Sequence, residues 1–357
     1  MPRQKTSAPF ARRLLKWFDQ HGRHDLPWQH PREPYRVWLS EIMLQQTQVS
    51  TVIPYFKRFL KRFPTIQSLA AAPTDDVLAH WAGLGYYARA RNLQRCAQHI
   101  VAEHGGEFPR DLETLTDLPG IGRSTAGAIL TQAFGQRHAI LDGNVRRVLA
   151  RHAAIAGWTG APTVQKKLWQ LSEELLPKSR LADYTQAIMD LGATVCTSRN
   201  PHCRNCPINA DCRAHQTNTV QNYPAPKPKR ERPRRQRWLL LIENHEGRFL
   251  CERRPPSGIW GGLWCPPLHE EASDWKKLSR QQYGMQCGEP MCLPIVRHGF
   301  THFDLDLVPI RLRIRSSGSA IQKNPDQTWI KLAGETSSHG LPAPVSKLLQ
   351  SIDSSSP

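Results

Sequence analysis

Apolar residues in the first half of the chain recur at the three- and four-residue spacing of an amphipathic helix. Clear examples run from Phe10 to Phe18 and from Val164 to Leu175, and Thr163, a residue type that caps helices, precedes the second. Short glycine and proline breaks, such as Leu118–Gly120, separate the periodic segments. The pattern predicts an all-helical region from Phe10 to about Ala214.

The pattern changes beyond Gln216. The segment Tyr223–Arg237 carries four prolines and seven basic residues against one acidic residue, and this composition predicts an extended linker. Such a linker is either a solvated tether or a segment that follows a phosphate backbone.

Strand-like segments follow the linker. Trp238–Ile242 and Arg248–Arg253 flank Asn244–Gly247, which is the arrangement of a β-hairpin. Two further strands and one helix are expected at Leu305–Ile314, Thr328–Leu332 and Pro344–Ile352. We therefore expect a helical domain at 1–216, a basic linker at 217–237 and a smaller α+β domain at 238–357.

Length and charge narrow the possible partners. The 357 residues suffice for two domains, and 48 Lys and Arg against 30 acidic residues give a formal net charge of +18. This excess favours a polyanionic partner, with nucleic acid as the leading candidate, although positive charge also serves solubility. The chain contains no run of about 18 apolar residues, and Met1–Phe10 lacks the apolar core of a signal peptide. We expect the protein to stay out of the membrane and to act in the cytoplasm.

Four of the nine cysteines have the spacing of metal ligands. They follow a C-x6-C-x2-C-x5-C pattern at Cys196, Cys203, Cys206 and Cys212. Zinc sites more often pair two C-x2-C knuckles, and only one is present here, so an iron-sulfur cluster is favoured over zinc and over unligated thiols. The remaining cysteines are interpreted as packing residues.

A glycine turn and two carboxylates are the other candidates for chemistry. Gly120 and Gly122 precede a helix whose free N–H groups could hold a phosphate, although an ordinary glycine-rich turn has the same composition. Asp142 stands in Leu141–Arg147 and could equally be a helix cap, whereas Glu41 could be a solvent-facing helical residue. Each of these segments therefore has a structural interpretation as well as a functional one.

Taken together, these segments closely resemble the adenine DNA glycosylases of the MutY family, within the helix-hairpin-helix superfamily that includes endonuclease III. The resemblance covers nearly the whole chain, from Trp28 through the cysteine loop into the C-terminal domain. It implies an all-α glycosylase domain followed by a Nudix-like α+β domain. It also implies one [4Fe-4S] cluster per chain, held by the four cysteines of the loop at 196–212.

The resemblance assigns roles to single residues. Gly120 and Gly122 would grip a DNA phosphate, Asp142 would be the essential aspartate, and Glu41, in the motif Ser40–Gln48, would be the general acid. Asn144 could hold Asp142 or a sugar-phosphate group.

Further residues match positions that contact the DNA or the base. Gln46 and Tyr86 match residues that wedge into the base stack, and Trp28 and Gln186 match the adenine pocket. Ser124 stands where strand-cutting relatives carry the lysine that forms a Schiff base, so we expect little strand scission.

The C-terminal domain matches the part of these enzymes that senses 8-oxoguanine. The matching segments are Arg254–Trp264 and Phe300–Phe303, with Thr301 in the place of a common serine and His302 beside it. No glutamate-rich Nudix box is present in the sequence, so this domain should recognise a lesion and not hydrolyse a pyrophosphate.

The expected function is base excision repair by a monomer on duplex DNA of the nucleoid. Glu41 would protonate a ring nitrogen of an extruded adenine, most plausibly N7, while an ionised Asp142 stabilises the positive sugar. Three rival hypotheses are a glycosylase-lyase for oxidised pyrimidines, a non-catalytic lesion-binding protein and a nucleotide hydrolase. Ser124 disfavours the glycosylase-lyase. The presence of both carboxylates disfavours the lesion-binding protein, and the missing glutamate box disfavours the nucleotide hydrolase.

Overall fold

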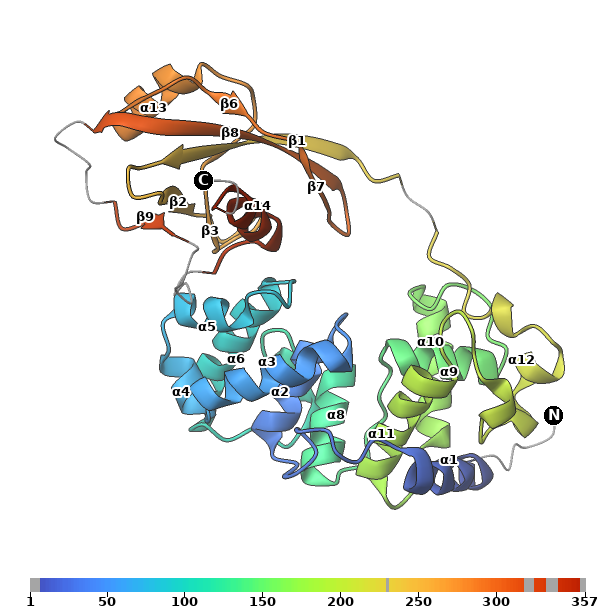
Figure 1. Cartoon of the computed structure of the whole chain (residues 1–357). Coiled ribbons are helices and arrows are strands. Elements are labelled where there is room, and N and C mark those ends of the chain that lie inside the picture. The colour runs from blue at the N-terminus through green and yellow to red at the C-terminus, as the bar shows by residue number, and fades with distance from the viewer. Residues whose placement is uncertain (1–6, 229–230, 318–323, 332–339, 354–357) are drawn as a thin grey trace. The chain divides into compact units, whose positions relative to one another are not determined.

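The computed structural model describes residues 7–228, 231–317, 324–331 and 340–353, and it divides into two compact units (Figure 1). The first unit comprises Met1–Ala71 and Asn92–Lys229, and the second comprises Ala72–Arg91 and Arg230–Pro357. Sequence patterning placed the division near residue 216 and kept residues 72–91 with the helical domain. Each unit is described by itself.

The first unit is helical, as the apolar periodicity predicted. Its α-helices are α1 (Ser7–His21), α2 (Pro34–Leu44), α3 (Val49–Arg62), α4 (Ile66–Ala71), α6 (Ala88–His104), α7 (Leu112–Asp117), α8 (Arg123–Phe134), α9 (Gly143–His152), α10 (Pro162–Leu175), α11 (Leu181–Asp190) and α12 (Arg213–Gln216). The first residues of α6 belong to the second unit. Helix α11 continues directly into a π-helical turn, Leu191–Val195, and three short 3-10 turns follow at Cys203–Asn205, Asn209–Asp211 and Val220–Asn222. Among the described residues, no helix is long and apolar enough to cross a membrane.

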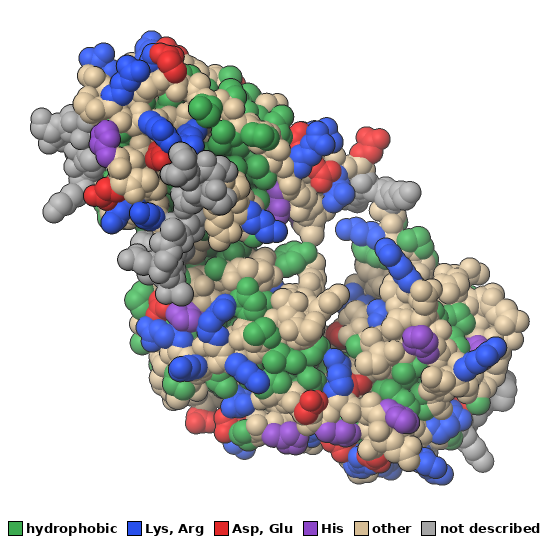
Figure 2. Space-filling model, viewed as in Figure 1, with side chains coloured by type: hydrophobic (Ala, Val, Ile, Leu, Met, Phe, Trp, Pro, Cys, Tyr) green, Lys and Arg blue, Asp and Glu red, His purple; other side chains and the backbone are tan. Residues whose placement is uncertain are grey.

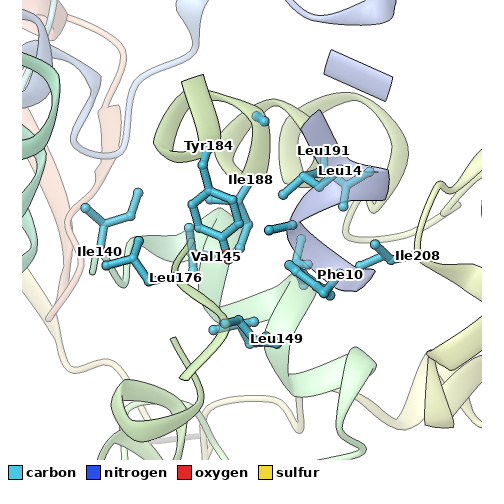
Figure 3. Close-up of a cluster of buried hydrophobic side chains, with 14 of the residues drawn as sticks. Phe10, Leu14, Ile140, Val145, Leu149, Leu176, Tyr184, Ile188, Leu191 and Ile208 are labelled. Atoms are coloured by element: carbon cyan, nitrogen blue, oxygen red, sulfur yellow. The ribbon is translucent and has the colours of Figure 1, made fainter. Parts of the chain in front are cut away.

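One core cluster joins α1, α9, α10 and α11 (Figure 3). Phe10 and Leu14 of α1 meet Val145 and Leu149 of α9, and all four side chains are fully or almost fully buried. Their four-residue spacing places each pair on one face of its helix. Truncating Leu149 to alanine would cost roughly 2–5 kcal/mol, the usual range for a fully buried leucine. This packing holds the start of α9 in place, and α9 begins directly after Asp142.

The second unit contains a mixed sheet. Its central pair, β1 (Arg234–Glu243) and β8 (Asp304–Ser317), runs parallel from Arg234↔Asp304 to Glu243↔Arg313. The sheet order is β3-β2-β1-β8-β5, with β4 on β1, β6 and β7 on β8, and β9 on β2. The other strands are β2 (Phe249–Arg253), β3 (Trp264–Cys265), β4 (Leu268–His269), β5 (Met285–Cys287), β6 (Met291–Cys292), β7 (Val296–Gly299) and β9 (Gln327–Ile330).

The predicted hairpin around Asn244 is present. Glu243 of β1 pairs with Phe249 of β2, and the Asn244 Oδ1 atom accepts hydrogen bonds from the backbone N–H groups of Glu246 and Arg248, at 3.0 and 2.9 Å. An asparagine that binds its own turn in this way stabilises the reversal of the chain. Strand β1 begins at Arg234, inside the segment that composition assigned to the linker.

Three helices lie wholly within the second unit, counting only the residues that the structure describes. Helix α5 (Thr74–Trp81) comes from the early part of the chain, whereas α13 (Trp275–Tyr283) and α14 (Ala343–Asp353) belong to the C-terminal part. The buried Trp275 of α13 packs with Leu240 and Leu312 of the central strands. Helix α14 covers the expected helix at Pro344–Ile352. Strand β9 matches the expected strand from Thr328, whose last position, Leu332, lies outside the described residues.

Candidate active site

A cavity of about 1040 Å³ opens in the helical unit. Its wall is formed by residues from α2, from the start of α8, from the start of α9 and from α11 with the turn that follows it. The residues singled out from the sequence that line it are Trp28, Glu41, Gln46, Ser124, Asp142, Asn144 and Gln186. Segments separated by more than a hundred residues therefore meet at one cavity.

Asp142 is both a helix cap and a cavity residue. It is the N-cap of α9, where its Oδ1 atom accepts a 2.7 Å hydrogen bond from the Val145 N–H. The side-chain amide of Asn144 donates to Oδ2 at 3.3 Å. Burial raises the pKa of Asp142, against the lowering effects of the Val145 N–H, the Arg147 charge and Asn144. The interpretation of Asp142 as a helix cap is therefore compatible with its interpretation as a functional residue.

Glu41 lies on α2 with part of its surface open to the cavity. Protein surrounds its carboxyl group, and this burial, together with the charge of Asp142, raises the pKa of Glu41 from 4.5 to about 8. The side chain of Gln132 donates a hydrogen bond that opposes the shift. Glu41 is therefore protonated at neutral pH, as a general acid must be.

The two carboxyl groups differ in how well their surroundings stabilise negative charge. Asp142 has a backbone N–H, an amide, a guanidinium and the N-terminus of α9, whereas Glu41 has one amide. Burial raises the pKa of both carboxyl groups. When only one of two such groups is protonated, the proton resides on the group whose anion is less stabilised by its surroundings. We assign the proton to Glu41 and the charge to Asp142.

Hydrogen bonds on either side of Asp142 position its backbone. The hydroxyl of Ser124 accepts a hydrogen bond from the Leu141 N–H at 2.9 Å. Arg147 donates to the Asn144 side-chain oxygen at 2.8 Å and to the backbone oxygen of Cys196 at 2.7 Å. The sequence singled out Asn144 as a residue that could hold Asp142, and Ser124 as the residue in place of a Schiff-base lysine. It gave no signal for Arg147.

Trp28 and Gln186 form another part of the wall. Both side chains are 3% exposed, and Trp28 packs edge to face against Phe56, with ring centroids 5.5 Å apart. The Gln186 side-chain amide donates to Asp190 at 2.8 Å, and Arg23 pairs with the same carboxylate at 2.5 Å. Sequence analysis missed Gln132 and Asp190, because a polar residue inside a helix has no distinguishing local pattern, and it missed Arg23, which lies in the connection after α1.

The glycine turn joins α7 to α8. Gly120 has φ of +80°, and a Cβ atom there would lie 2.9 Å from the Cβ of Asn92, so the position requires glycine. Gly122 is the N-cap of α8, and nothing lies within 4 Å of where its Cβ would be. Gly122 has no side chain that could cap α8, and the N-terminus of a helix is a place where a phosphate can bind.

Gln46 and Tyr86 share an unusual backbone conformation. Their φ angles are +59° and +50°, in the left-handed region that non-glycine residues rarely adopt. Both side chains are exposed, and 45% of the tyrosine surface is accessible. Strain of this kind concentrates at functional sites.

The four spaced cysteines line one small cavity, of about 20 Å³. Burial and the neighbouring thiols raise the pKa of Cys206 to about 12, and Arg151 donates a 3.3 Å hydrogen bond to the sulfur of Cys196. In the part of the chain that the structure describes, no set of three or more ligand side chains is gathered closely enough for a single metal ion. Four thiols that line one cavity are a donor set that fits an iron-sulfur cluster.

The other five cysteines were interpreted as packing residues, and one of them does not fit. Cys96, Cys251, Cys265 and Cys287 are buried, whereas Cys292 is exposed. Cys292 lies on β6, a strand of two residues that pairs only through its backbone with β8.

In the second unit, Thr301 and His302 occupy the turn between β7 and β8. Both are exposed, and the turn is closed by a 2.8 Å hydrogen bond from the Phe300 N–H to the Phe303 oxygen. The rings of Phe300 and Phe303 stack at 4.6 Å, and the Arg235 guanidinium lies 4.5 Å from the Phe303 ring centre. The turn thus presents a hydroxyl and an imidazole on an aromatic base.

Comparisons with known proteins agree with this arrangement. Residues 39–174 match the HhH-GPD superfamily of base excision DNA repair proteins, and residues 238–351 match the NUDIX domain. The adenine DNA glycosylase of Buchnera aphidicola subsp. Acyrthosiphon pisum (strain APS) is 39% identical over 97% of this chain and 98% of its own length. The chain belongs to the adenine DNA glycosylase family. It is accordingly a hydrolase of N-glycosyl bonds that removes adenine from DNA in base excision repair.

Further matches are a second relative of the same family and two solved structures of the same fold. The human adenine DNA glycosylase is 36% identical over 90% of this chain and 70% of its own. Among solved structures, a thermostable thymine-DNA glycosylase is 28% identical, with a TM-score of 0.52, over 58% of this chain and 95% of that one. A non-covalent endonuclease III-DNA complex, at 24% identity and a TM-score of 0.52, shares the fold.

Proposed function

We propose that this enzyme hydrolyses the bond between adenine and deoxyribose where the adenine is paired with 8-oxoguanine or guanine in duplex DNA, leaving an abasic site. The observation that carries the proposal is the pair of carboxyl groups on one cavity, Glu41 with a pKa raised to about 8 and Asp142 with the better-stabilised charge. An acid and an anion that face one cavity are what the cleavage of a glycosidic bond requires.

The adenine must first leave the helix. Extrusion costs a few kcal/mol, which phosphate contacts and filling of the vacated space can offset. The N-terminus of α8, which Gly122 does not cap with a side chain, supports a phosphate contact. The exposed, left-handed residues Gln46 and Tyr86 are suited to enter the stack, because their side chains are already directed away from the core.

Bond cleavage follows from the unequal proton affinity of the two acids. Glu41 gives its proton to N7 of the extruded adenine, and the C1′–N9 bond breaks with its electron pair moving to the base. The sugar is left with positive charge, which the Asp142 carboxylate stabilises while water adds to C1′ and loses a proton. Asn144 and the Val145 N–H hold that carboxylate in place.

We propose that the enzyme removes the base without cutting the strand. Strand scission in this superfamily needs an amine to form an imine with the sugar. Ser124 offers a hydroxyl at that position, and the hydroxyl already accepts the Leu141 N–H.

The C-terminal unit is proposed to recognise 8-oxoguanine through Thr301 and His302. Their exposure on a stiff, aromatic-backed turn supports a recognition role. The chain carries no glutamate-rich box, which argues against pyrophosphate hydrolysis in this unit.

We further propose that Cys196, Cys203, Cys206 and Cys212 hold one [4Fe-4S] cluster. Bound there, the cluster would cross-link the loop through four iron-thiolate bonds. Arg151 donates to the Cys196 sulfur and, at 2.7 Å, to the Thr197 oxygen, so it orders the loop from the α9 side.

Net charge and surface composition support DNA as the partner. Lys and Arg side chains are spread over both units on the face shown in Figure 2, in keeping with the net charge of +18. We propose a monomer that acts on DNA in the cytoplasm, in association with the nucleoid.

A single assay tests the proposal. Duplexes with adenine opposite 8-oxoguanine, guanine or thymine, and a duplex with thymine glycol, are scored for strand breaks with and without alkali. We expect breaks only after alkali and only for the first two duplexes. Release of thymine glycol with spontaneous breaks would identify the oxidised-pyrimidine rival, and binding without any release would identify a lesion-binding protein.

A further inference from the structure

A buried carboxylate stands behind one wall of the active-site cavity. Asp190 is 1% exposed and lies one helical turn after Gln186 on α11. Its Oδ1 atom accepts a 2.8 Å hydrogen bond from the side-chain nitrogen of Gln186. Gln186, unlike Asp190, lines the cavity.

Arg23, which also lines the cavity, pairs with the same carboxylate. Its backbone N–H donates to Oδ2 at 2.8 Å, and its side chain donates to Oδ1 at 2.9 Å from Nε and 2.5 Å from Nη2. Three side-chain donors thus converge on one oxygen. A carboxylate paired with a guanidinium accepts hydrogen bonds and has no proton to donate.

This pairing decides which way the Gln186 amide points. An amide has a donor end and an acceptor end, and only the donor end can face an acceptor. With its nitrogen committed to Asp190, Gln186 has its oxygen left for a ligand in the cavity. A cavity wall that offers a hydrogen-bond acceptor favours a base that carries a hydrogen-bond donor.

We propose that Asp190, held by Arg23, is a positioning residue that orients the Gln186 amide so that the pocket selects a 6-aminopurine over a 6-oxopurine. Adenine presents an exocyclic amino group, which can donate to the Gln186 oxygen. Hypoxanthine and guanine present a carbonyl oxygen at the same position, and two acceptors would then face each other in a buried site. The inference rests on the proposed function, because it takes adenine as the extruded base.

The test compares adenine with hypoxanthine, each opposite 8-oxoguanine, by single-turnover rates of base release. Asp190→Asn keeps the shape of the side chain but replaces one acceptor oxygen with a donor NH2 group. The Gln186 amide is then free to turn. We expect this variant to lower the adenine-to-hypoxanthine rate ratio about 10- to 100-fold, the effect of one buried unpaired polar group. Asp183→Asn is the matched control on the same helix, because Asp183 pairs with Arg32 and not with Gln186. It should leave the ratio unchanged.

Two further variants separate orientation from a loss of structure. Arg23→Gln combined with Asp190→Asn removes the positive charge of Arg23 together with the carboxylate, and should reproduce the lower ratio in a folded protein. In a Gln186→Leu background there is no amide to orient, so Asp190→Asn should no longer change the ratio.

Two results would overturn the inference. One is an equal loss of both rates in Asp190→Asn and in the double variant, with the ratio unchanged. The other is a full effect of Asp190→Asn in the Gln186→Leu background. Failure of the proposed function itself would look different, because the unaltered enzyme would then not release adenine from the 8-oxoguanine duplex at all.

Discussion

Burial, together with the negative charge of Asp142, raises the pKa of Glu41, although the two residues are about a hundred positions apart in the chain. Their relationship is asymmetric, since the donors around Asp142 stabilise its anion and Glu41 has a single amide. The reaction therefore depends on which acid holds the proton, and this has measurable consequences.

Base release should slow as the pH rises through about 8, where Glu41 loses its proton. Glu41→Gln should lose about 10²- to 10⁴-fold in single-turnover rate, the usual contribution of a general acid. A pH series of single-turnover rates on the 8-oxoguanine duplex measures both effects. A Glu41→Gln enzyme that kept its rate together with the alkaline limb would contradict the role.

The raised pKa of Glu41 should also make the stability of the folded protein depend on pH. Because folding raises the pKa of Glu41 from 4.5 to about 8, its contribution to stability is present in full below pH 4.5 and is lost as the pH rises through 8. Glu41→Gln does not titrate, so its stability relative to the unaltered protein should increase from pH 5 to pH 9. Urea unfolding at several pH values measures the difference, and a constant or falling difference would count against the buried acid.

Asp142→Asn should abolish base release and change the titration of its partner. Removing the charge removes one cause of the raised pKa of Glu41, so the pKa of Glu41 should move down toward 4.5. Carboxyl titration followed by infrared or NMR spectroscopy detects the shift. An unchanged Glu41 titration would show that the two acids are not coupled.

Thr301→Val removes a hydroxyl and keeps the side-chain shape. Loss of one hydrogen bond of about 1 kcal/mol should reduce the preference for 8-oxoguanine over guanine opposite adenine by about fivefold. Binding of duplexes that carry a non-cleavable adenosine analogue measures this preference. Thr217→Val, on the helical unit, is a control that should leave the preference unchanged.

Cys206→Ala should lose bound iron and its visible absorbance, whereas Cys96→Ala should keep both. Cys206 lines the cysteine cavity, and Cys96 is a buried thiol of α6. Iron content per chain measures the outcome. Full iron in Cys206→Ala would exclude it as a ligand.

Much of this protein was determined by local sequence. The apolar spacing of Phe10 and Leu14, or of Val145 and Leu149, is enough to make a helical face, because helix periodicity is a short-range property. The Asn244–Gly247 turn and the cysteine spacing are likewise local. The resemblance then placed Glu41, Asp142 and Gln186 in one site, and in the structure all three line one cavity.

Only the tertiary structure decided the features that arise between distant segments. Arg234–Arg237 look like linker, yet they extend β1, because backbone hydrogen bonds to β8 do not depend on side-chain polarity. The hydrogen bond between Arg23 and Asp190 joins residues 167 positions apart, and no local sequence pattern predicts it. The raised pKa of Glu41 has the same origin, since burial and the Asp142 charge exist only once the helices pack.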